Sequence, residues 1–136
     1  LYCNNVLENV PSMNISQKIK DRCIGEAKFL RANYYFILVQ LFGDVPLSLT
    51  ASKPGDDLFP ARTDRMKIYN EVIIPDLIEA IETLPRREEY AARDKGRASK
   101  GAAAGILAKV YLTLGQYERK EIRIRWSRFL RSSTWG

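Results

Sequence analysis

The chain contains no histidine and only two cysteines, and both shortages narrow the chemistry open to it. Without histidine, a Ser-His-Asp or Cys-His nucleophile and every imidazole-based metal site are excluded. Cys3 and Cys23 are too few for a disulfide framework and cannot complete a zinc site, so we expect two unpaired thiols. We predict no metal site and no cofactor.

Long hydrophobic runs are also lacking. No stretch approaches the ~20 uninterrupted apolar residues that cross a bilayer, and the first residues have neither the basic nor the apolar region of a secretory signal. With 46% hydrophobic and 28% charged residues, the 136-residue chain has the composition of an ordinary globular protein. We therefore expect at most one domain, with no membrane span of its own.

The net charge of +6 is concentrated near the C-terminal end. Residues 118 to 131 hold six basic and two acidic side chains, a net +4, so the other 122 residues contribute only about +2. Because the body of the chain has no strong positive footprint, we expect no nucleic-acid partner. Nucleic-acid binding through the basic end ranks last among the functions considered.

The strongest predicted helix begins near Asn14 or Ser16, either of which can cap its first amides, and ends at Gly43, which can take the left-handed conformation that closes a helix. Apolar side chains recur three or four residues apart along it, the pattern of an amphipathic helix. This predicted stripe comprises Ile19, Cys23, Ala27, Leu30, Tyr34, Ile37 and Leu41.

Four aromatic side chains on or next to this helix, Tyr34, Tyr35, Phe36 and Phe42, invite comparison with sugar-stacking platforms. Tyr34 lies on the predicted stripe and Phe36 near its edge, so we assign both to the core. Tyr35 is the one expected to face solvent, and a single tyrosine does not make a glycan platform.

A long loop is predicted from Leu47 to Arg62, where proline and glycine interrupt any period. A second helix is predicted from about Thr63 to Leu84, with a kink or break at Pro75, whose ring removes a backbone donor. Its apolar positions recur at three or four residues: Met66, Tyr69, Ile73, Leu77, Ala80 and Leu84.

Residues 86–97 are polar and lack a period, so they read as a second connection. Ser99 can cap a third, alanine-rich helix that runs to Gly115. No alternating apolar run is long enough to support a sheet. The sequence therefore predicts an all-α fold in which helix packs on helix.

Three segments in this order resemble the SusD/RagB family: EAKFLRANYYF at 26–36 with LFGDVPL at 41–47, the helix 69–85, and GRASKGAA through LAKVYL at 96–112. Together they cover roughly residues 24–117. The resemblance implies tetratricopeptide-like antiparallel helix pairs with long connecting loops, forming part of a larger SusD-like fold.

The spacing of Leu107, Ala108 and Tyr111 is similar to the first helix of a tetratricopeptide repeat, which needs a small residue where this chain has Lys120. We therefore divide the chain into a partial SusD-like N-terminal helical region, 1–117, and an atypical basic tail, 118–136. Two interpretations of the tail stay open: a truncated or frame-shifted end, or a basic helix on the surface.

The resemblance implies non-catalytic capture of a nutrient, a glycan or peptide, on the surface of the bacterial outer membrane beside a SusC-like TonB-dependent transporter. Members are lipid-anchored, but Cys3 follows no apolar run and is not taken as the lipidated residue. We expect Leu47 to Arg62 to border the ligand or the transporter. The ligand-binding residues cannot be assigned, and the alternative is a free-standing tetratricopeptide-like scaffold for protein partners.

We interpret the charged residues as parts of the structure and not as catalytic groups. Arg31 lies within an otherwise apolar run and needs a carboxylate, which Asp76 or Asp44 can supply, so we predict a buried ion pair. Glycoside hydrolysis needs two carboxyl groups across a cleft. Adjacent acids such as 88–89 and 56–57 are ordinarily just solvated, so we predict no catalytic residues and no enzyme.

Overall fold

The computed structural model describes residues 1–51, 53, 55 and 60–115. The predicted all-α fold is confirmed, because the two strands in this part of the chain have only two residues each. None of the described helices is long and apolar enough to span a membrane. In chain order the elements are α1 (Tyr2–Asn9), η1 (Val10–Ser12), α2 (Gln17–Phe42), β1 (Val45–Pro46), β2 (Arg62–Thr63), α3 (Arg65–Ile68), η2 (Tyr69–Ile73), α4 (Ile74–Thr83), η3 (Arg87–Glu89), η4 (Ala92–Asp94) and α5 (Lys100–Thr113).

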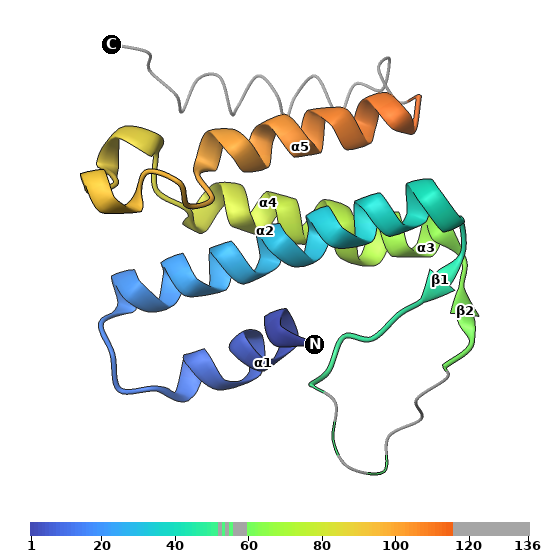
Figure 1. Cartoon of the computed structure of the whole chain (residues 1–136), viewed down its shortest axis with the longest axis horizontal. Coiled ribbons are helices and arrows are strands. Elements are labelled where there is room, and N and C mark those ends of the chain that lie inside the picture. The colour runs from blue at the N-terminus through green and yellow to red at the C-terminus, as the bar shows by residue number, and fades with distance from the viewer. Residues whose placement is uncertain (52, 54, 56–59, 116–136) are drawn as a thin grey trace.

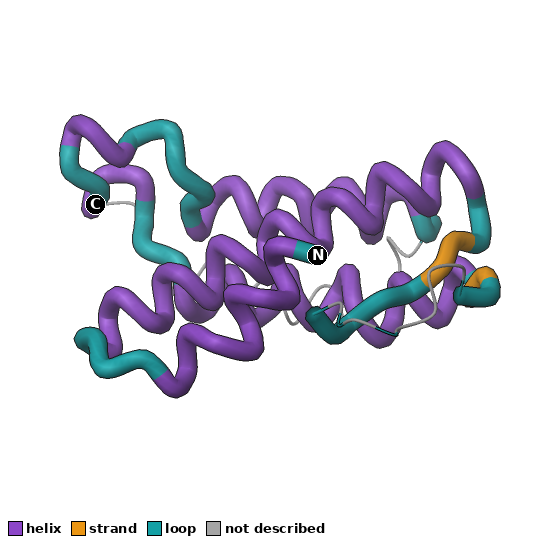
Figure 2. The backbone as a smooth tube through the Cα atoms, turned by 60° about the horizontal axis from the view of Figure 1, so that its bottom comes forward, coloured by secondary structure: helices purple, strands orange, loops and turns teal. Residues whose placement is uncertain are grey.

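Helices α2, α4 and α5 run in alternating directions, and α4 packs against both of the others (Figure 1). The short α1 lies along α2. The connections lie at the ends of the helices, as Figure 2 shows for the tube coloured by secondary structure. The arrangement gives the antiparallel helix pairs that the family resemblance implies.

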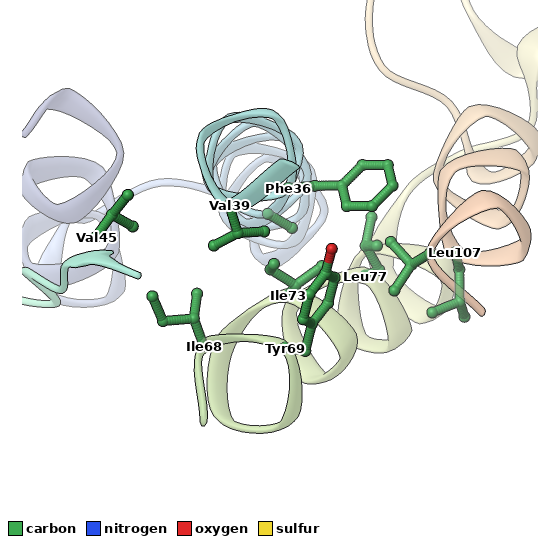
Figure 3. Packing of buried hydrophobic residues seen from close by; sticks show 10 residues of the cluster. Phe36, Val39, Val45, Ile68, Tyr69, Ile73, Leu77 and Leu107 are labelled. Carbon is green, nitrogen blue, oxygen red and sulfur yellow. The ribbon is translucent and has the colours of Figure 1, made fainter. Parts of the chain in front are cut away.

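The main core lies between α2, η2, α4 and α5 (Figure 3). Its central contact is an edge-to-face pair of Phe36 from α2 and Tyr69 from η2, with ring centroids 6.2 Å apart. Such pairs contribute about 0.5–1.5 kcal/mol beyond the area they bury. The buried members are Ala32, Phe36, Val39, Val45, Ile68, Tyr69, Ile73, Leu77, Leu107 and Val110.

The predicted buried stripe of α2 is wrong for most of its members. Of the seven positions only Ala27 is buried, and Cys23 is half-buried. Tyr34, assigned to the core, has 59% of its surface exposed, whereas Phe36 has 2%. Since successive helical residues are about 100° apart, these two rings point to nearly opposite sides of α2. The prediction for Phe36 is confirmed.

Both ends of α2 lie where the sequence placed them. The helix begins directly after Ser16, although the Ser16 side chain makes no capping hydrogen bond, and it ends at Gly43 with φ of 70°. Gly43 therefore takes a positive φ, which residues with a side chain rarely adopt. The third helix is also as predicted, since Ser99 Oγ accepts a hydrogen bond from the Ala102 amide at 3.4 Å.

The predicted kink or break at Pro75 is not a break: the second helix continues through this residue, but its regular geometry is interrupted directly before it. Residues Tyr69–Ile73, directly before α4, form a turn of π-helix, and α4 then holds Pro75 in its first turn. Proline lacks the amide that an α-helix needs and crowds the carbonyl four residues earlier. A widened turn is a known way to accommodate such an insertion within a helix. The helix keeps its apolar face: of the predicted positions, only Met66 is exposed.

Two features were not predicted. The first is helix α1, which at eight residues is shorter than the ten to twelve or so over which helical periodicity is a dependable signal. The strands β1 and β2 pair antiparallel, with Val45 opposite Thr63, and so join the two ends of the predicted loop. A two-residue strand is too short for alternation to appear in the sequence. The predicted tail, residues 118–136, lies outside the described residues and stays a prediction.

Candidate functional site

The segment that leaves β1 is held in place by side chains from α1. Asn4 Nδ2 donates hydrogen bonds to the carbonyl oxygens of Ser48 and Thr50, each at 2.9 Å. One turn further along α1, Glu8 Oε1 accepts from the Ala51 amide at 2.7 Å. The beginning of the predicted functional loop therefore has a defined backbone position through Ala51.

Helix α2 contributes a further contact to this segment through Tyr35. Its hydroxyl accepts a hydrogen bond from the Ser48 amide at 2.9 Å and lies 3.2 Å from the Ser48 carbonyl, to which it donates. Tyr35 was expected to face solvent, but it is half-buried and its polar end is occupied. The prediction fails because helical periodicity indicates on which face of a helix a residue lies. It does not indicate whether a loop covers that face.

A buried ion pair lies beneath this segment. Arg31 Nε and Nη2 donate to the two carboxylate oxygens of Asp76 at 2.7 and 2.9 Å, and Arg31 Nη1 donates to Asn4 Oδ1 at 3.1 Å. The side chains of Arg31 and Asp76 retain 15% and 5% of their exposure. The predicted pair is thus present, with Asp76 as the partner. Asp44 instead accepts from the Arg65 amide at 3.0 Å.

These contacts form one network, which we call the loop anchor: Asn4, Glu8, Arg31, Tyr35 and Asp76. The bidentate geometry of Arg31 and Asp76 fixes the direction of the remaining guanidinium nitrogen. That nitrogen orients the Asn4 amide, whose donor atoms then hold the loop backbone. The anchor joins α1, α2 and α4 to one loop. Its side chains therefore serve to hold the backbone of that loop in place.

A second polar cluster ties the connection between α4 and α5 to the first part of α2. Arg97 Nε and Nη2 donate to the two carboxylate oxygens of Glu26, each at 2.7 Å. This hydrogen bonding raises the pKa of Arg97. Nearby, the Tyr90 hydroxyl donates to the Ala98 carbonyl at 2.7 Å. Burial raises the pKa of Tyr90 above its usual value, and the Glu26 carboxylate raises it further.

The acidic pairs considered in the sequence do not form a site within the described residues. Glu88 and Glu89 are exposed around the short η3 turn, where Glu89 Oε2 accepts from the Arg86 amide at 3.3 Å. The other pair, 56–57, lies outside the described residues. Among the described residues no group of histidine, cysteine, aspartate or glutamate side chains could hold a metal ion. Both cysteines are free thiols, as predicted.

Sequence reasoning found Arg31 and Asp76 but missed Asn4 and Glu8. A charged residue inside an apolar run is a visible signal, because a buried charge needs a partner. An asparagine and a glutamate in a short polar helix carry no such signal. Their role depends on a loop more than 40 residues away in the sequence.

Residues 1–112 match the protein family described as starch-binding and associating with the outer membrane. The chain is 37% identical over 109 residues to a SusD-like protein of Bacteroides ovatus and 33% identical over 117 residues to one of Formosa agariphila. These matches cover 79% and 85% of this chain but 19% and 22% of the relatives. The chain thus spans about a fifth of their length.

Solved structures of the same kind share the arrangement of the helices. A SusD-like protein of Bacteroides fragilis and a laminarin binding SusD-like protein each match with a TM-score of 0.76 at 36% identity. The matches cover 85% and 84% of this chain and 22% and 24% of those chains. The predicted tetratricopeptide-like fold is confirmed. Since the family match also includes all three segments that suggested it, this chain belongs to the SusD-like family.

Proposed function

We propose that this chain is the N-terminal helical part of a non-catalytic protein that captures carbohydrate at the bacterial outer membrane. The match of residues 1–112 to the starch-binding, outer-membrane-associated family carries the proposal. A relative at 36% identity is a laminarin binding protein, which supports a glycan over a peptide as the ligand. In this proposal the protein is lipid-anchored and surface-exposed, and it works beside a SusC-like TonB-dependent transporter.

The loop anchor gives this chain a defined part in that function. Loops that carry recognition residues are effective when a rigid scaffold positions them. Here the hydrogen bonds of Asn4 and Glu8 fix the backbone of residues 48–51, while the side chain of Leu49 is exposed. We place this segment at the border of the glycan site or the transporter, with the anchor beneath it as support.

The test begins with the gene, read in both directions beyond the codons for residues 1 and 136. A lipoprotein signal upstream and further helices downstream would agree with the capture function. A closed frame of 136 codons would contradict it and favour the scaffold for protein partners.

The protein encoded by that complete frame is then titrated calorimetrically with laminarin, starch and a peptide mixture. Saturable binding of a glycan, without release of reducing sugar, is the expected result. Binding of the peptide mixture alone would refute the choice of ligand, and release of reducing sugar would refute the non-catalytic assignment.

A pair of variants tests the placement of the loop. Leu49→Arg changes an exposed side chain on the anchored segment, and Leu112→Arg changes an equally exposed one on α5. We expect Leu49→Arg to weaken glycan binding or co-purification with the transporter, and Leu112→Arg to affect neither. Equal behaviour of the two variants would contradict the placement.

A further inference from the structure

Helix α1 lies along α2, beside the segment that leaves β1 (Figure 1). Its eight residues are fewer than the ~12–15 that make even a marginally stable helix in water, so its structure depends on contacts outside it. The one buried residue within it is Asn4. Neither hydrophobic cluster in the described part of the chain includes a residue of α1, whereas α2, α4 and α5 all contribute. Helix α1 is therefore docked on the core and is not part of it.

Three hydrogen bonds join side chains of α1 to the segment that leaves β1. Asn4 Nδ2 donates to the carbonyl oxygens of Ser48 and Thr50. Glu8 Oε1 accepts from the Ala51 amide. A further bond, from the guanidinium on α2 to Asn4 Oδ1 at 3.1 Å, joins α1 to the core. The same side chain thus docks the helix and holds the segment.

The backbone of this segment is held from two sides. The Ser48 amide donates to the Tyr35 hydroxyl of α2 at 2.9 Å, while the Ala51 amide donates to Glu8 of α1 at 2.7 Å. Undocking of α1 leaves the first of these bonds in place and removes the second. The two amides, three residues apart, therefore report separately on the contacts to α2 and to α1.

We infer that α1 is a strap, whose docking on α2 decides whether residues 50 and 51 keep one backbone position. Elements that bury few apolar contacts open locally while the core stays folded. Because α1 and the segment share their hydrogen bonds, opening of α1 releases residues 50 and 51. By linkage, a ligand that needs the segment in place also tightens α1.

Control of capture by the strap rests on the proposed function, which places this segment at the border of the glycan site. The coupling between α1 and the segment does not depend on that placement. Two experiments are therefore needed, one on the coupling and one on the ligand.

Hydrogen exchange of single amides, followed by NMR in the 136-residue chain, tests the coupling. Asn4→Ala removes the side chain that joins α1 to both the segment and α2. Asn5→Ala is the matched control, because Asn5 is the next residue of the same helix and is exposed. Alanine favours a helix more than asparagine does, so helix propensity alone would tighten α1 in both variants.

In Asn4→Ala, we expect the amides of Ala51 and of the second turn of α1 to exchange faster by about tenfold or more, and by a common factor, because they open together. The Ser48 amide should change less, since α2 still holds it, and the buried amides of α2 should not change. Asn5→Ala should alter none of them. An unchanged Ala51 amide, a faster Ala51 amide without faster α1 amides, or equal loss of protection throughout α2 would overturn the inference.

Glu8→Ala gives a second test if Asn4→Ala does not yield folded protein. It removes the acceptor of the Ala51 amide and leaves the contact between Asn4 and α2 in place. Faster exchange within α1 is the expected result, because the segment and the helix support each other. Unchanged exchange within α1 would contradict the coupling.

The ligand experiment uses the protein encoded by the complete frame, with exchange read from peptides by mass spectrometry. Laminarin at about ten times its Kd should slow exchange in α1 and at residues 50–51 by about tenfold. Binding of laminarin without slower exchange in α1 would overturn control of capture by the strap. Failure of laminarin to bind would count against the proposed ligand alone, and exchange in the 136-residue chain would still decide the coupling.

Discussion

The inner and outer faces of α2 carry similar side chains but have opposite environments. Phe36 and Val39 on the inner face are buried against η2 and α4, while Tyr34 and Ile37 on the outer face remain exposed. Both sets follow helical spacing, and neither is marked by charge. The C-terminal half of α2 is apolar on most of its circumference, so its sequence tells less about its neighbours than an amphipathic pattern would.

The largest expected effect contrasts one aromatic ring from each face. Phe36→Ala removes the ring that packs against Tyr69 and should lower the free energy of unfolding by about 3–5 kcal/mol. Tyr34→Ala should change it by less than about 0.5 kcal/mol in the 136-residue chain, because the ring is exposed. Urea denaturation followed by circular dichroism measures both. Equal losses would show that the two faces are not distinct.

The inner face shows which parts of the fold could be read from the sequence. Helix limits followed from local chemistry, such as the positive φ of Gly43 and the cap by Ser99. The buried side of α2 did not follow, because burial depends on which helix arrives next to it. Gly25 and Ala32 on the inner face permit the close approach of α4, but such small residues contribute little to a pattern of apolar side chains.

The loop anchor likewise contains one interaction that the sequence predicted and others that it did not. The need of Arg31 for a carboxylate was predictable, since a lone buried charge is costly. Its support by Asn4 was not predictable, because an asparagine in a polar helix has many equivalent uses. The candidate site was therefore recognised as a loop from proline and glycine content, while the residues that position the loop came from the structure.

The second prediction concerns the side of α2 that faces α1. Arg31→Ala leaves Asp76 buried without its partner and should cost about 3 kcal/mol, at the lower end for buried pairs since Arg31 keeps some exposure. Lys28→Ala breaks the pair with Glu79, whose side chain is half-exposed, and should cost at most about 1 kcal/mol. Thermal denaturation of both variants is the measurement. A normal melting temperature for Arg31→Ala would disprove the structural role of the pair. Ligand preference should not change.

A smaller effect tests the close approach of α2 and α4. A Cβ atom at Gly25 would lie 2.5 Å from Thr83 Oγ1 and 3.1 Å from Leu84, whereas one at Gly105 on α5 meets nothing within 4 Å. Overpacking costs about 1–3 kcal/mol, and alanine regains up to about 1 kcal/mol of helix propensity. Gly25→Ala should therefore destabilise by about 1 kcal/mol, while Gly105→Ala should stabilise. Stabilisation by both would mean that the helices are less tightly packed than described.

The smallest expected effect lies at high pH and involves two buried phenols. Burial raises the pKa of Tyr69 and, with Glu26, that of Tyr90 above the usual 10.0. A raised pKa stabilises the folded protein fully below about pH 10, and this stability is lost as the pH rises through the folded-state pKa. Stability should thus decline above about pH 10.

Tyr90→Phe removes one of these groups and should flatten the alkaline decline. At neutral pH it should cost about 1 kcal/mol, because the Ala98 carbonyl loses the hydroxyl that donates to it. Urea midpoints at neutral and alkaline pH provide the comparison. A decline as steep in Tyr90→Phe as in the unsubstituted chain would show that the burial of this phenol does not govern the alkaline loss of stability.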